Sequence, residues 1–216
     1  MNDGVYLSPR VNPGRASDSG YVLAHGDRQG NLFVSDRVRE AAMSGKLFIA
    51  NFGVLTAPLV GPATQAVTVR RPSAWLRVSQ GKVIYIVRHT TVIEVAGATT
   101  QGELLLATSS VDVGDGTGAD ASLIQNANPK MLSDTPGTTG RQLATGDVAV
   151  VTNIAEIDRD SFAADAVNLK YEFNANEMGF LVPIVGPATF LCYVGGNAVN
   201  FFAQTLFIEE DADLAS

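Results

Sequence analysis

The chain has 216 residues, of which 46% are apolar and 17% charged, and its net charge is −7. The apolar fraction is ample for a buried core, and the length fits one β-domain with or without an extended arm. Overall acidity argues against a nucleic-acid binder, because phosphate contacts need clustered Lys and Arg. No apolar run reaches about 18 residues, so the sequence predicts no membrane-spanning helix.

The charge is divided unevenly along the chain. Residues 1–100 hold 11 Lys/Arg and 6 Asp/Glu, a net +5, whereas residues 101–216 hold 4 and 16, a net −12. Such asymmetry is able to drive docking between subunits. The alternative is that the two halves interleave in one sandwich and their charges pair within the chain.

The single cysteine, Cys192, excludes an intramolecular disulfide and lies in an apolar run, which predicts a small core residue. Residues 1–4 lack the charged and apolar regions of a signal peptide. The sequence therefore predicts a protein made in a cytoplasm and not exported by an encoded signal.

Residues 1–34 are rich in Pro and Gly and show little periodicity, which predicts an extended N-terminal arm. The arm either becomes ordered by lying across a neighbouring molecule or is a disordered terminus. Residues 35–45 form the one convincing helix, with Val38, Ala41 and Ala42 on one face. Gly45 suits the left-handed position that follows a helix.

From Lys46 onward the pattern changes to strands separated by Gly and Pro turns, which is typical of antiparallel connections. We expect strands at 46–52, 65–71, 73–79, 82–95, 102–109, 147–157, 168–173, 180–194 and 200–209. Residues 111–147 are rich in Asp, Gly, Asn and Thr and predict a long functional or partner-facing loop. The predicted fold is mainly β, a jelly-roll-like β-sandwich over residues 35–216 that follows the arm at 1–34.

Two local patterns predict details of this sandwich. The segment 195–197 (Gly-Gly-Asn) predicts the turn of a terminal hairpin between the last two strands. Residues 58–64 (PLVGPAT) nearly match residues 183–189 (PIVGPAT), and each copy leads into a β-run. The two copies predict equivalent turns on the two sheets.

No recognisable catalytic set is present, so we predict a protein that is not an enzyme and has no cofactor. Nucleophilic catalysis needs a base beside the nucleophile, and neither His25 nor His89 is placed near one by the sequence. The loop carboxylates Asp112, Asp115 and Asp120 suggest calcium, but their spacing departs from the EF-hand pattern and is more typical of turns. We predict no metal site.

Basic side chains are the candidate contact residues. Arg70, Arg71 and Arg77, with Lys82 and Arg88, lie on adjacent predicted strands. They form either a solvent-facing strand surface or a patch that docks on an acidic neighbour such as residues 111–165 of another subunit. The other candidate contacts lie on the arm and the helix: Arg15, Arg28, Arg37 and Arg39.

Two stretches resemble certain tailed-bacteriophage virion proteins. The first comprises residues 26–36 (GDRQGNLFVSD), the short helix and the step 44–48 (SGKLF) into the first strand. The second comprises 179–183 (GFLVP), 186–187 (GP) and the closing strand 204–210, whose apolar end precedes two glutamates. The resemblance implies a capsid cement or decoration protein with a jelly-roll body, often a homotrimer, that clamps major capsid protein subunits in the virion.

Three functions follow in order of preference. The first is a phage capsid cement protein, which would work by burying area between subunits. The second is a virion receptor-binding or tail protein, or a carbohydrate-binding module, on the same fold, and it needs exposed aromatic side chains in a groove. The third is a β-sandwich hydrolase, whose acid pair or metal the sequence does not reveal: Glu156, Asp158 and Asp160 are more typical of a solvated strand end.

Overall fold

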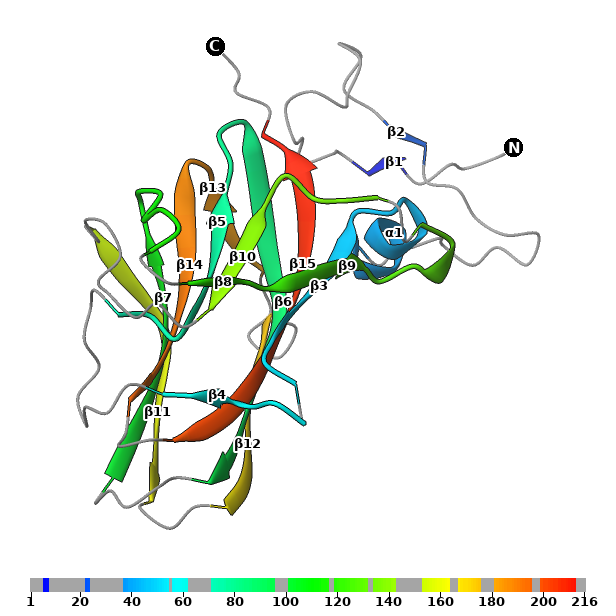
Figure 1. Ribbon diagram of the computed structural model, residues 1–216. Coiled ribbons are helices and arrows are strands. Elements are labelled where there is room, and N and C mark those ends of the chain that lie inside the picture. The colour runs from blue at the N-terminus through cyan, green and yellow to red at the C-terminus, as the bar shows by residue number, and fades with distance from the viewer. Residues whose placement is uncertain are drawn as a thin grey trace.

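The computed structural model describes residues 6–7, 22–23, 37–54, 56–61, 71–95, 101–116, 119–131, 134–142, 153–163, 167–175, 181–195 and 199–212. Two antiparallel sheets pack against each other, and one short α-helix, α1 (Arg37–Met43), accompanies them (Figure 1). The predicted mainly-β sandwich is confirmed. Within the described part of the chain, no helix is long and apolar enough to cross a membrane.

We call the first sheet the helix-side sheet, because α1 packs on its outer face. Its strand order is β12-β6-β15-β3-β9, with β13 beside β6 and β4 beside β15. Its strands are β3 (Leu47–Phe52), β4 (Leu59–Val60), β6 (Lys82–Val95), β9 (Leu123–Asn126), β12 (Val167–Asn174), β13 (Val182–Val185) and β15 (Asn200–Asp211).

We call the second sheet the loop-side sheet, because residues 110–116 cover part of its outer face. Its strand order is β11-β7-β14-β5-β10-β8. Its strands are β5 (Ala74–Val78), β7 (Gln101–Ser109), β8 (Asp120–Ala121), β10 (Thr139–Gln142), β11 (Ile154–Ala163) and β14 (Ala188–Gly195), and the 3-10 turn η1 (Pro129–Met131) lies between β9 and β10.

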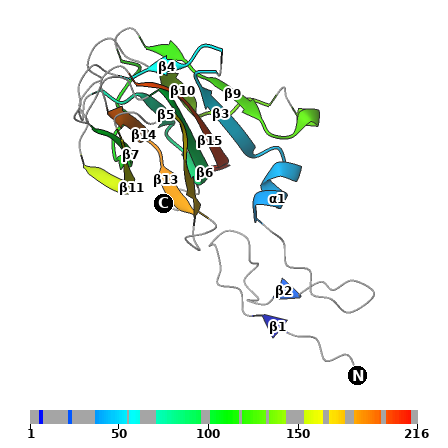
Figure 2. The ribbon, with the colours of Figure 1, turned by 90° about the horizontal axis from the view of Figure 1, so that it is seen from below.

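The strand order is that of a jelly roll. The run β12-β6-β15-β3 in one sheet matches the run β11-β7-β14-β5 in the other. The strands at the same position in the two runs follow one another along the chain, except that the two-residue β4 lies between β3 and β5. The chain crosses between the sheets at each of these pairs, which generates two nested Greek keys. Strands β8, β9 and β10 extend both sheets beyond the β3 and β5 side (Figures 1 and 2).

The core between the sheets is filled by aromatic and branched side chains. Phe48 and Phe52 of β3, Phe201 and Phe207 of β15, and Phe190 of β14 are each at most 5% exposed. The rings of Phe48 and Phe207 stack with centroids 5.8 Å apart. Cys192 is fully buried in the same cluster, as predicted, and burial raises the pKa of its thiol to about 12.

Helix α1 covers part of the outer face of the helix-side sheet. Ala41 packs there against Leu47, Val87 and Ile208, with Val38 and Ala42 partly buried beside them, so the predicted apolar face of the helix is confirmed. The register of β6 and β15 shifts beside Val87, and this bulge turns Val87 toward the helix.

The helix also ends as predicted. Gly45 has φ +73° and follows the last turn, where its N–H donates to Ala42 O at 3.5 Å. A side chain at Gly45 would in addition meet Met131, because an ideal Cβ lies 2.5 Å from the Met131 sulfur. The glycine is therefore required by the backbone conformation, and a larger residue would in addition have to displace the Met131 side chain.

Two predictions about the second half of the chain are wrong. The last two strands do not form a hairpin: β14 lies in the loop-side sheet and β15 in the helix-side sheet, because the chain crosses the sandwich between them. Residues 111–147 are not one loop, since they contain β8, β9, η1 and β10. These strands are short, and their turn-rich composition hid them.

The two copies of the repeated segment occupy similar places in the fold. Both copies supply a short strand at the margin of the helix-side sheet, β4 in one case and β13 in the other, before the chain continues to the loop-side sheet. The matching glycines act alike: Gly61 N–H donates to Val199 O at 2.7 Å and Gly186 N–H to Lys82 O at 2.8 Å. The expectation that the copies lie on different sheets is wrong.

Other predictions fall outside the described residues. Of the arm at 1–34, the structure describes only the antiparallel pair β1 (Tyr6–Leu7) and β2 (Val22–Leu23). The strand expected at 65–71 lies almost entirely outside the described ranges, as does the first part of the strand expected at 147–157.

The two glutamates that close β15 tie other segments to the sandwich. Glu209 is buried, with 6% of its side chain exposed, and accepts the N–H groups of Gly137 and Thr138, each at 2.8 Å. Glu210 accepts a hydrogen bond from Arg37 of α1 at 3.1 Å, and the Arg37 guanidinium lies 3.9 Å from the centroid of the Tyr85 ring. One glutamate therefore holds the segment before β10, and the other holds the helix.

We predict that Glu209→Ala lowers the free energy of unfolding by about 3 kcal/mol, because two backbone N–H groups lose their acceptor. Glu210→Ala is the matched control and should cost under about 1 kcal/mol, since its ion pair is at the surface. Urea unfolding followed by circular dichroism measures both. Equal losses in the two variants would contradict the role assigned to Glu209.

His89 is a buried polar residue inside the sandwich. Its Nδ1 lies 2.8 Å from Thr205 Oγ1 and its Nε2 lies 2.9 Å from Thr91 Oγ1, and the side chain is about 1% exposed. Burial lowers its pKa from 6.5 to about 3. The folded state therefore holds a neutral imidazole, which serves as a hydrogen-bonding bridge within the core.

This lowered pKa predicts a pH dependence of stability. As the pH falls below about 6.5 the unfolded chain binds a proton that the folded chain does not, so stability is lost from there toward pH 3. Between pH 7 and pH 5 the native chain should lose about 2 kcal/mol more unfolding free energy than His89→Gln. Urea titrations at the two pH values measure this difference, and identical losses would count against it.

Candidate functional site

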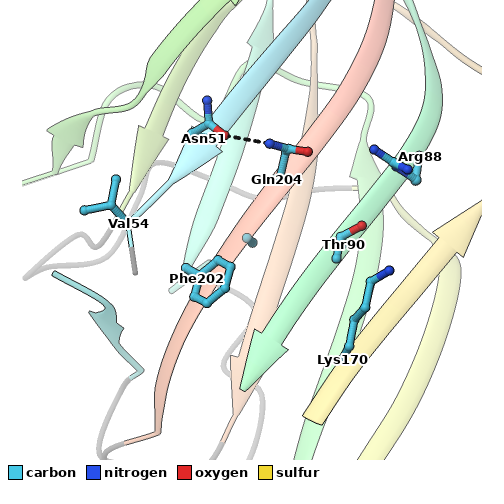
Figure 3. A pocket seen from close by; sticks show the side chains of 9 residues that line it. Asn51, Val54, Arg88, Thr90, Lys170, Phe202 and Gln204 are labelled. Carbon is cyan, nitrogen blue, oxygen red and sulfur yellow. Dashed lines mark hydrogen bonds between the residues drawn. The ribbon is translucent and has the colours of Figure 1, made fainter. Parts of the chain in front are cut away.

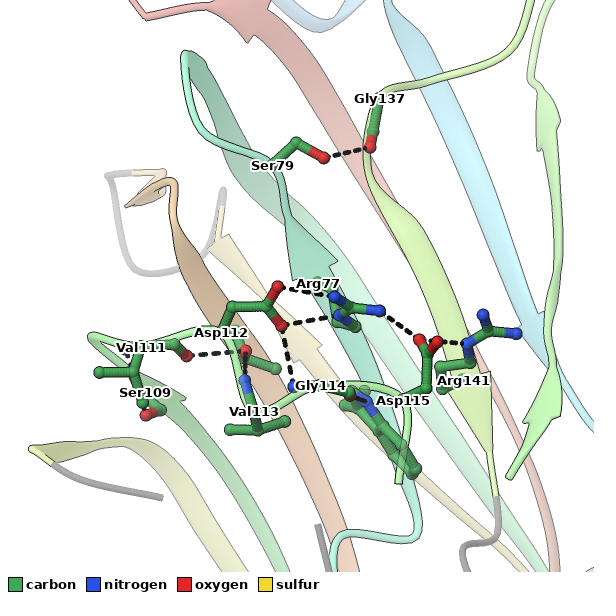
Figure 4. A network of polar contacts seen from close by, with 12 residues as sticks. Arg77, Ser79, Ser109, Val111, Asp112, Val113, Gly114, Asp115, Gly137 and Arg141 are labelled. Atoms are coloured by element: carbon green, nitrogen blue, oxygen red, sulfur yellow. Dashed lines mark hydrogen bonds and ion pairs between the residues drawn. The ribbon is translucent and has the colours of Figure 1, made fainter. Parts of the chain in front are cut away.

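The outer face of the loop-side sheet carries a network of charged side chains (Figure 4). Arg77 of β5 donates to both carboxylate oxygens of Asp112 at 2.7 Å and pairs with Asp115. Asp115 also accepts from Arg141 of β10 at 2.8 Å. The hydrogen bond from Arg77 lowers the pKa of Asp112, and that from Arg141 lowers the pKa of Asp115.

The same loop segment is fastened by uncharged contacts. Trp75 Nε1 donates to Gly114 O at 3.1 Å. Thr189 Oγ1 accepts from Val113 N at 3.2 Å and donates to Val111 O at 2.9 Å. Trp75, Leu105, Ala107, Val113, Leu191 and Tyr193 form a second buried cluster beneath this segment. Residues 110–116 therefore cover this part of the outer face of the loop-side sheet.

The network also bears on the calcium alternative. Guanidinium groups occupy both carboxylate oxygens of Asp112 and the Oδ1 oxygen of Asp115. Over the described ranges, no group of three or more His, Cys, Asp or Glu side chains is arranged to hold a metal. The arrangement supports a structural tie and gives no support to a calcium site.

The seven arginines predicted as contact residues have different positions. Arg15, Arg28 and Arg70 lie outside the described residues. Arg37 and Arg39 are exposed on α1, and Arg71 is exposed just before β5. Arg77 is three-quarters buried at the surface network and is already paired within its own chain. Contact with another subunit stays a prediction for all seven.

The structure does not bring the predicted basic patch together. Arg77 belongs to β5 and points to the outer side of the loop-side sheet, where it meets Asp112. Arg88 belongs to β6 and lines a hollow on the outer face of the helix-side sheet. The two arginines therefore lie on opposite faces of the sandwich, because β5 and β6 belong to different sheets.

The hollow is the candidate binding site. It has a volume of about 410 Å³ and is lined by four strands, β3, β6, β12 and β15, and by the two residues Gly53 and Val54 that follow β3 (Figure 3). Its lining residues are Asn51, Gly53, Val54, Arg88, Thr90, Lys170, Phe202, Ala203 and Gln204. We call this feature the groove.

Strand register explains why polar groups gather in the groove. Thr90, Gln204 and Asn51 are register partners on β6, β15 and β3, so their side chains form one row across the sheet. Gln204 Nε2 donates to Asn51 Oδ1 at 2.9 Å. Phe202 lies two residues from Gln204 and therefore on the same face. The groove thus combines an aromatic ring with a row of hydrogen-bonding groups.

The two cationic side chains of the groove, Lys170 and Arg88, differ in whether they are paired. Lys170 pairs with Glu172 on its own strand, and this hydrogen bond, together with the positive charge of Arg88, lowers the pKa of Glu172. Arg88 is exposed, and among the described residues it has no hydrogen bond and no ion pair within 4.0 Å. Its guanidinium is therefore the cation available to a ligand.

Sequence reasoning missed the groove. The lining residues come from four strands that are distant in sequence, so no single motif joins them. Only the period-2 alternation of β6 and β15 signals that Thr90, Phe202 and Gln204 face outward. The comparisons add no precedent: no protein-family model matches the chain, and no curated protein matches it.

The fastening of residues 110–116 predicts a fluorescence change. Trp75 is the only tryptophan of the chain and is fully buried. Asp112→Ala removes the acceptor of Arg77 and of Gly114 N, which should loosen the segment and shift Trp75 emission to longer wavelength. Quenching of Trp75 fluorescence by iodide should increase about twofold or more, because loss of the Asp112 contacts destabilises the closed segment by about 1 kcal/mol.

Glu156→Ala is the control for this experiment, because it removes a comparable exposed ion pair, with Arg159, on β11. Its emission should match that of the native chain. An unchanged spectrum in Asp112→Ala would show that the ion network does not hold the segment closed.

Proposed function

We propose that the chain is a bacteriophage virion structural protein that cements a capsid by bridging capsid subunits, as a homotrimer. The resemblance of residues 26–48 and 179–210 to such proteins supports this. The jelly roll agrees with it, since the fold occurs in capsid and lectin domains, although fold by itself does not fix function.

The distribution of exposed apolar side chains carries the proposal. Seven large apolar side chains of the described residues are exposed, and four of them, Met43, Val54, Val60 and Leu123, at 68, 54, 51 and 63%, lie at the end of α1 or along the β3, β4 and β9 side of the molecule. We call this surface the β9 edge. The other three, Ile154, Leu169 and Val185, lie singly on β11, β12 and β13. Exposed apolar groups gathered on one side of a sandwich are typical of a protein–protein contact surface.

The backbone at the β9 edge is firmly placed. Asn126 Nδ2 donates to Gly45 O at 2.6 Å, and Asn128 Nδ2 donates to Ala42 O at 3.1 Å. These bonds join β9 and its following turn to the C-terminal end of α1. A pre-organised surface binds without the entropy cost of ordering a loop. The edge thus suits repeated, multivalent contact with a shell.

The opposite edge of the sandwich has a different character. Among the described strands, β11 pairs with β7 alone, and its exposed positions include Glu156, Asp158, Arg159 and Asp160. Charged side chains on an edge strand prevent pairing with another chain. We therefore assign the contact with capsid or with sister subunits to the β9 edge and not to β11.

A second function, glycan binding by a receptor-binding protein or a carbohydrate-binding module, is favoured by one observation. The groove places Phe202 beside a row of amide and hydroxyl groups on a rigid sheet. Glycan binding in the groove is compatible with a capsid role, because the residues that define the groove and those that define the β9 edge have only Val54 in common.

The proposal predicts that Leu123→Asp weakens binding to purified capsids of the source virus, stripped of this protein, by at least about tenfold. Light scattering should show a homotrimer for the native chain and a smaller species for the variant. The native chain should also raise the melting temperature of the shells.

Val185→Asp is the matched control, since Val185 is 53% exposed on β13, away from the β9 edge. It should bind capsids as the native chain does. A native chain that stays monomeric and leaves shell melting unchanged would refute the cement function, and equal losses in both variants would refute the assignment to the β9 edge.

A further inference from the structure

We propose that the groove binds an acidic saccharide, with a sugar ring on Phe202 and the sugar carboxylate on Arg88. The inference deepens the second proposed function, glycan binding, and does not depend on capsid binding. It names the ligand class and the two side chains that select it.

The size and support of the groove suit a small ligand. Its volume of about 410 Å³ lies in the range of small-molecule sites. The lining side chains stand on β3, β6, β12 and β15, which form one continuous hydrogen-bonded sheet. A site built on paired strands is held in place more precisely than one built on loops.

The row of polar side chains matches the hydroxyl groups of a sugar. The Asn51–Gln204 hydrogen bond uses the Asn51 carbonyl oxygen and the Gln204 nitrogen. The Asn51 nitrogen and the Gln204 oxygen are left for other partners, one a donor and one an acceptor. Neighbouring sugar hydroxyls both donate and accept, so a pair of them satisfies both groups, and the Thr90 hydroxyl adds a third contact.

Phe202 supplies the apolar part of the site. It lies on the same outer face as Gln204 and is only partly buried, so its ring is open to the groove. The axial C–H groups of a pyranose form an apolar face that stacks on an aromatic ring. A ligand lying across Phe202 therefore brings its hydroxyl groups over the row of Thr90, Gln204 and Asn51.

The charge of the site selects the acidic group. Arg88 presents a guanidinium that binds a carboxylate through two parallel hydrogen bonds. Lys170 is already paired with Glu172, whose own negative charge lies beside the groove. One unpaired cation next to a carboxylate suits a single sugar carboxylate and disfavours densely charged polyphosphates.

Isothermal titration tests this with matched ligands: sialyllactose against its methyl ester, and digalacturonate against galactobiose, so that the two members of each pair have the same number of sugar rings and differ in the acidic group. The native full-length chain should bind an acidic member with a Kd on the order of 1 mM and its neutral partner about tenfold more weakly. Arg88→Gln should remove the preference for the acidic member. Phe202→Ala should remove binding of both members.

Two further variants complete the test. Arg39→Gln removes an exposed arginine on α1 and should bind like the native chain. Glu172→Gln removes the like charge and frees Lys170, so it should strengthen acidic binding several-fold. The inference is overturned if no ligand binds, if neutral and acidic members bind equally, or if Arg88→Gln and Phe202→Ala bind as the native chain does. Loss of glycan binding with intact capsid binding would leave the cement function standing.

Discussion

Both faces of the central strands have to be covered, and this constraint shapes the whole molecule. The inner faces of the two sheets share one core of phenylalanine and branched side chains. Strand β14 is buried at every position from Ala188 to Gly195, so its outer side needs a second cover. Residues 110–116 provide that cover, and α1 does the same for part of the helix-side sheet.

The parts of the sheet surfaces that neither α1 nor residues 110–116 cover are where we propose that the protein binds. Helix α1 covers only one portion of the helix-side sheet, and the groove occupies another portion beside it. Part of the loop-side sheet is covered by residues 110–116, which the arginine–aspartate network and Trp75 hold in place. Among the described residues, the surfaces that we propose for binding are the groove and the β9 edge, which meet at Val54.

Part of the unequal charge of the two halves of the chain is paired within the molecule. Arg77 pairs with Asp112 and Asp115, Lys82 with Asp211, and Arg37 with Glu210. Each pair joins a cation from residues 1–100 to a carboxylate from residues 101–216. Interleaving of the halves in one sandwich therefore accounts for these charges, as the second interpretation of the asymmetry held.

Much of the fold was predictable, because periodicity and turn chemistry are local. The long β-run at 82–95, the helix with its following Gly45, and the buried Cys192 all follow from nearest-neighbour patterns. The crossing from β14 to β15 was not, since a Gly-rich connection fits a hairpin and a sheet-to-sheet crossing equally well. Strand β9 also escaped notice, because it is short and stabilised by pairing with β3.

The groove lay beyond sequence reasoning for a related reason. Its members are one to three residues from each of several strands distant in sequence, and only the register of β3, β15 and β6 makes them neighbours. Arg88 illustrates the limit: the sequence grouped it with Arg77, whereas the fold places the two on opposite faces. Which residues share a face depends on the order of strands, which is a property of the whole chain.

We propose that the β9 edge is the surface that adheres to capsids. Hydrogen–deuterium exchange on the chain bound to empty capsids tests this proposal most directly. Compared with the free chain, amides of residues 47–60 and 119–131 should exchange more slowly in the bound state, while β11 (Ile154–Ala163) should be unchanged. Protection confined to β11 and the loop-side sheet would contradict the account.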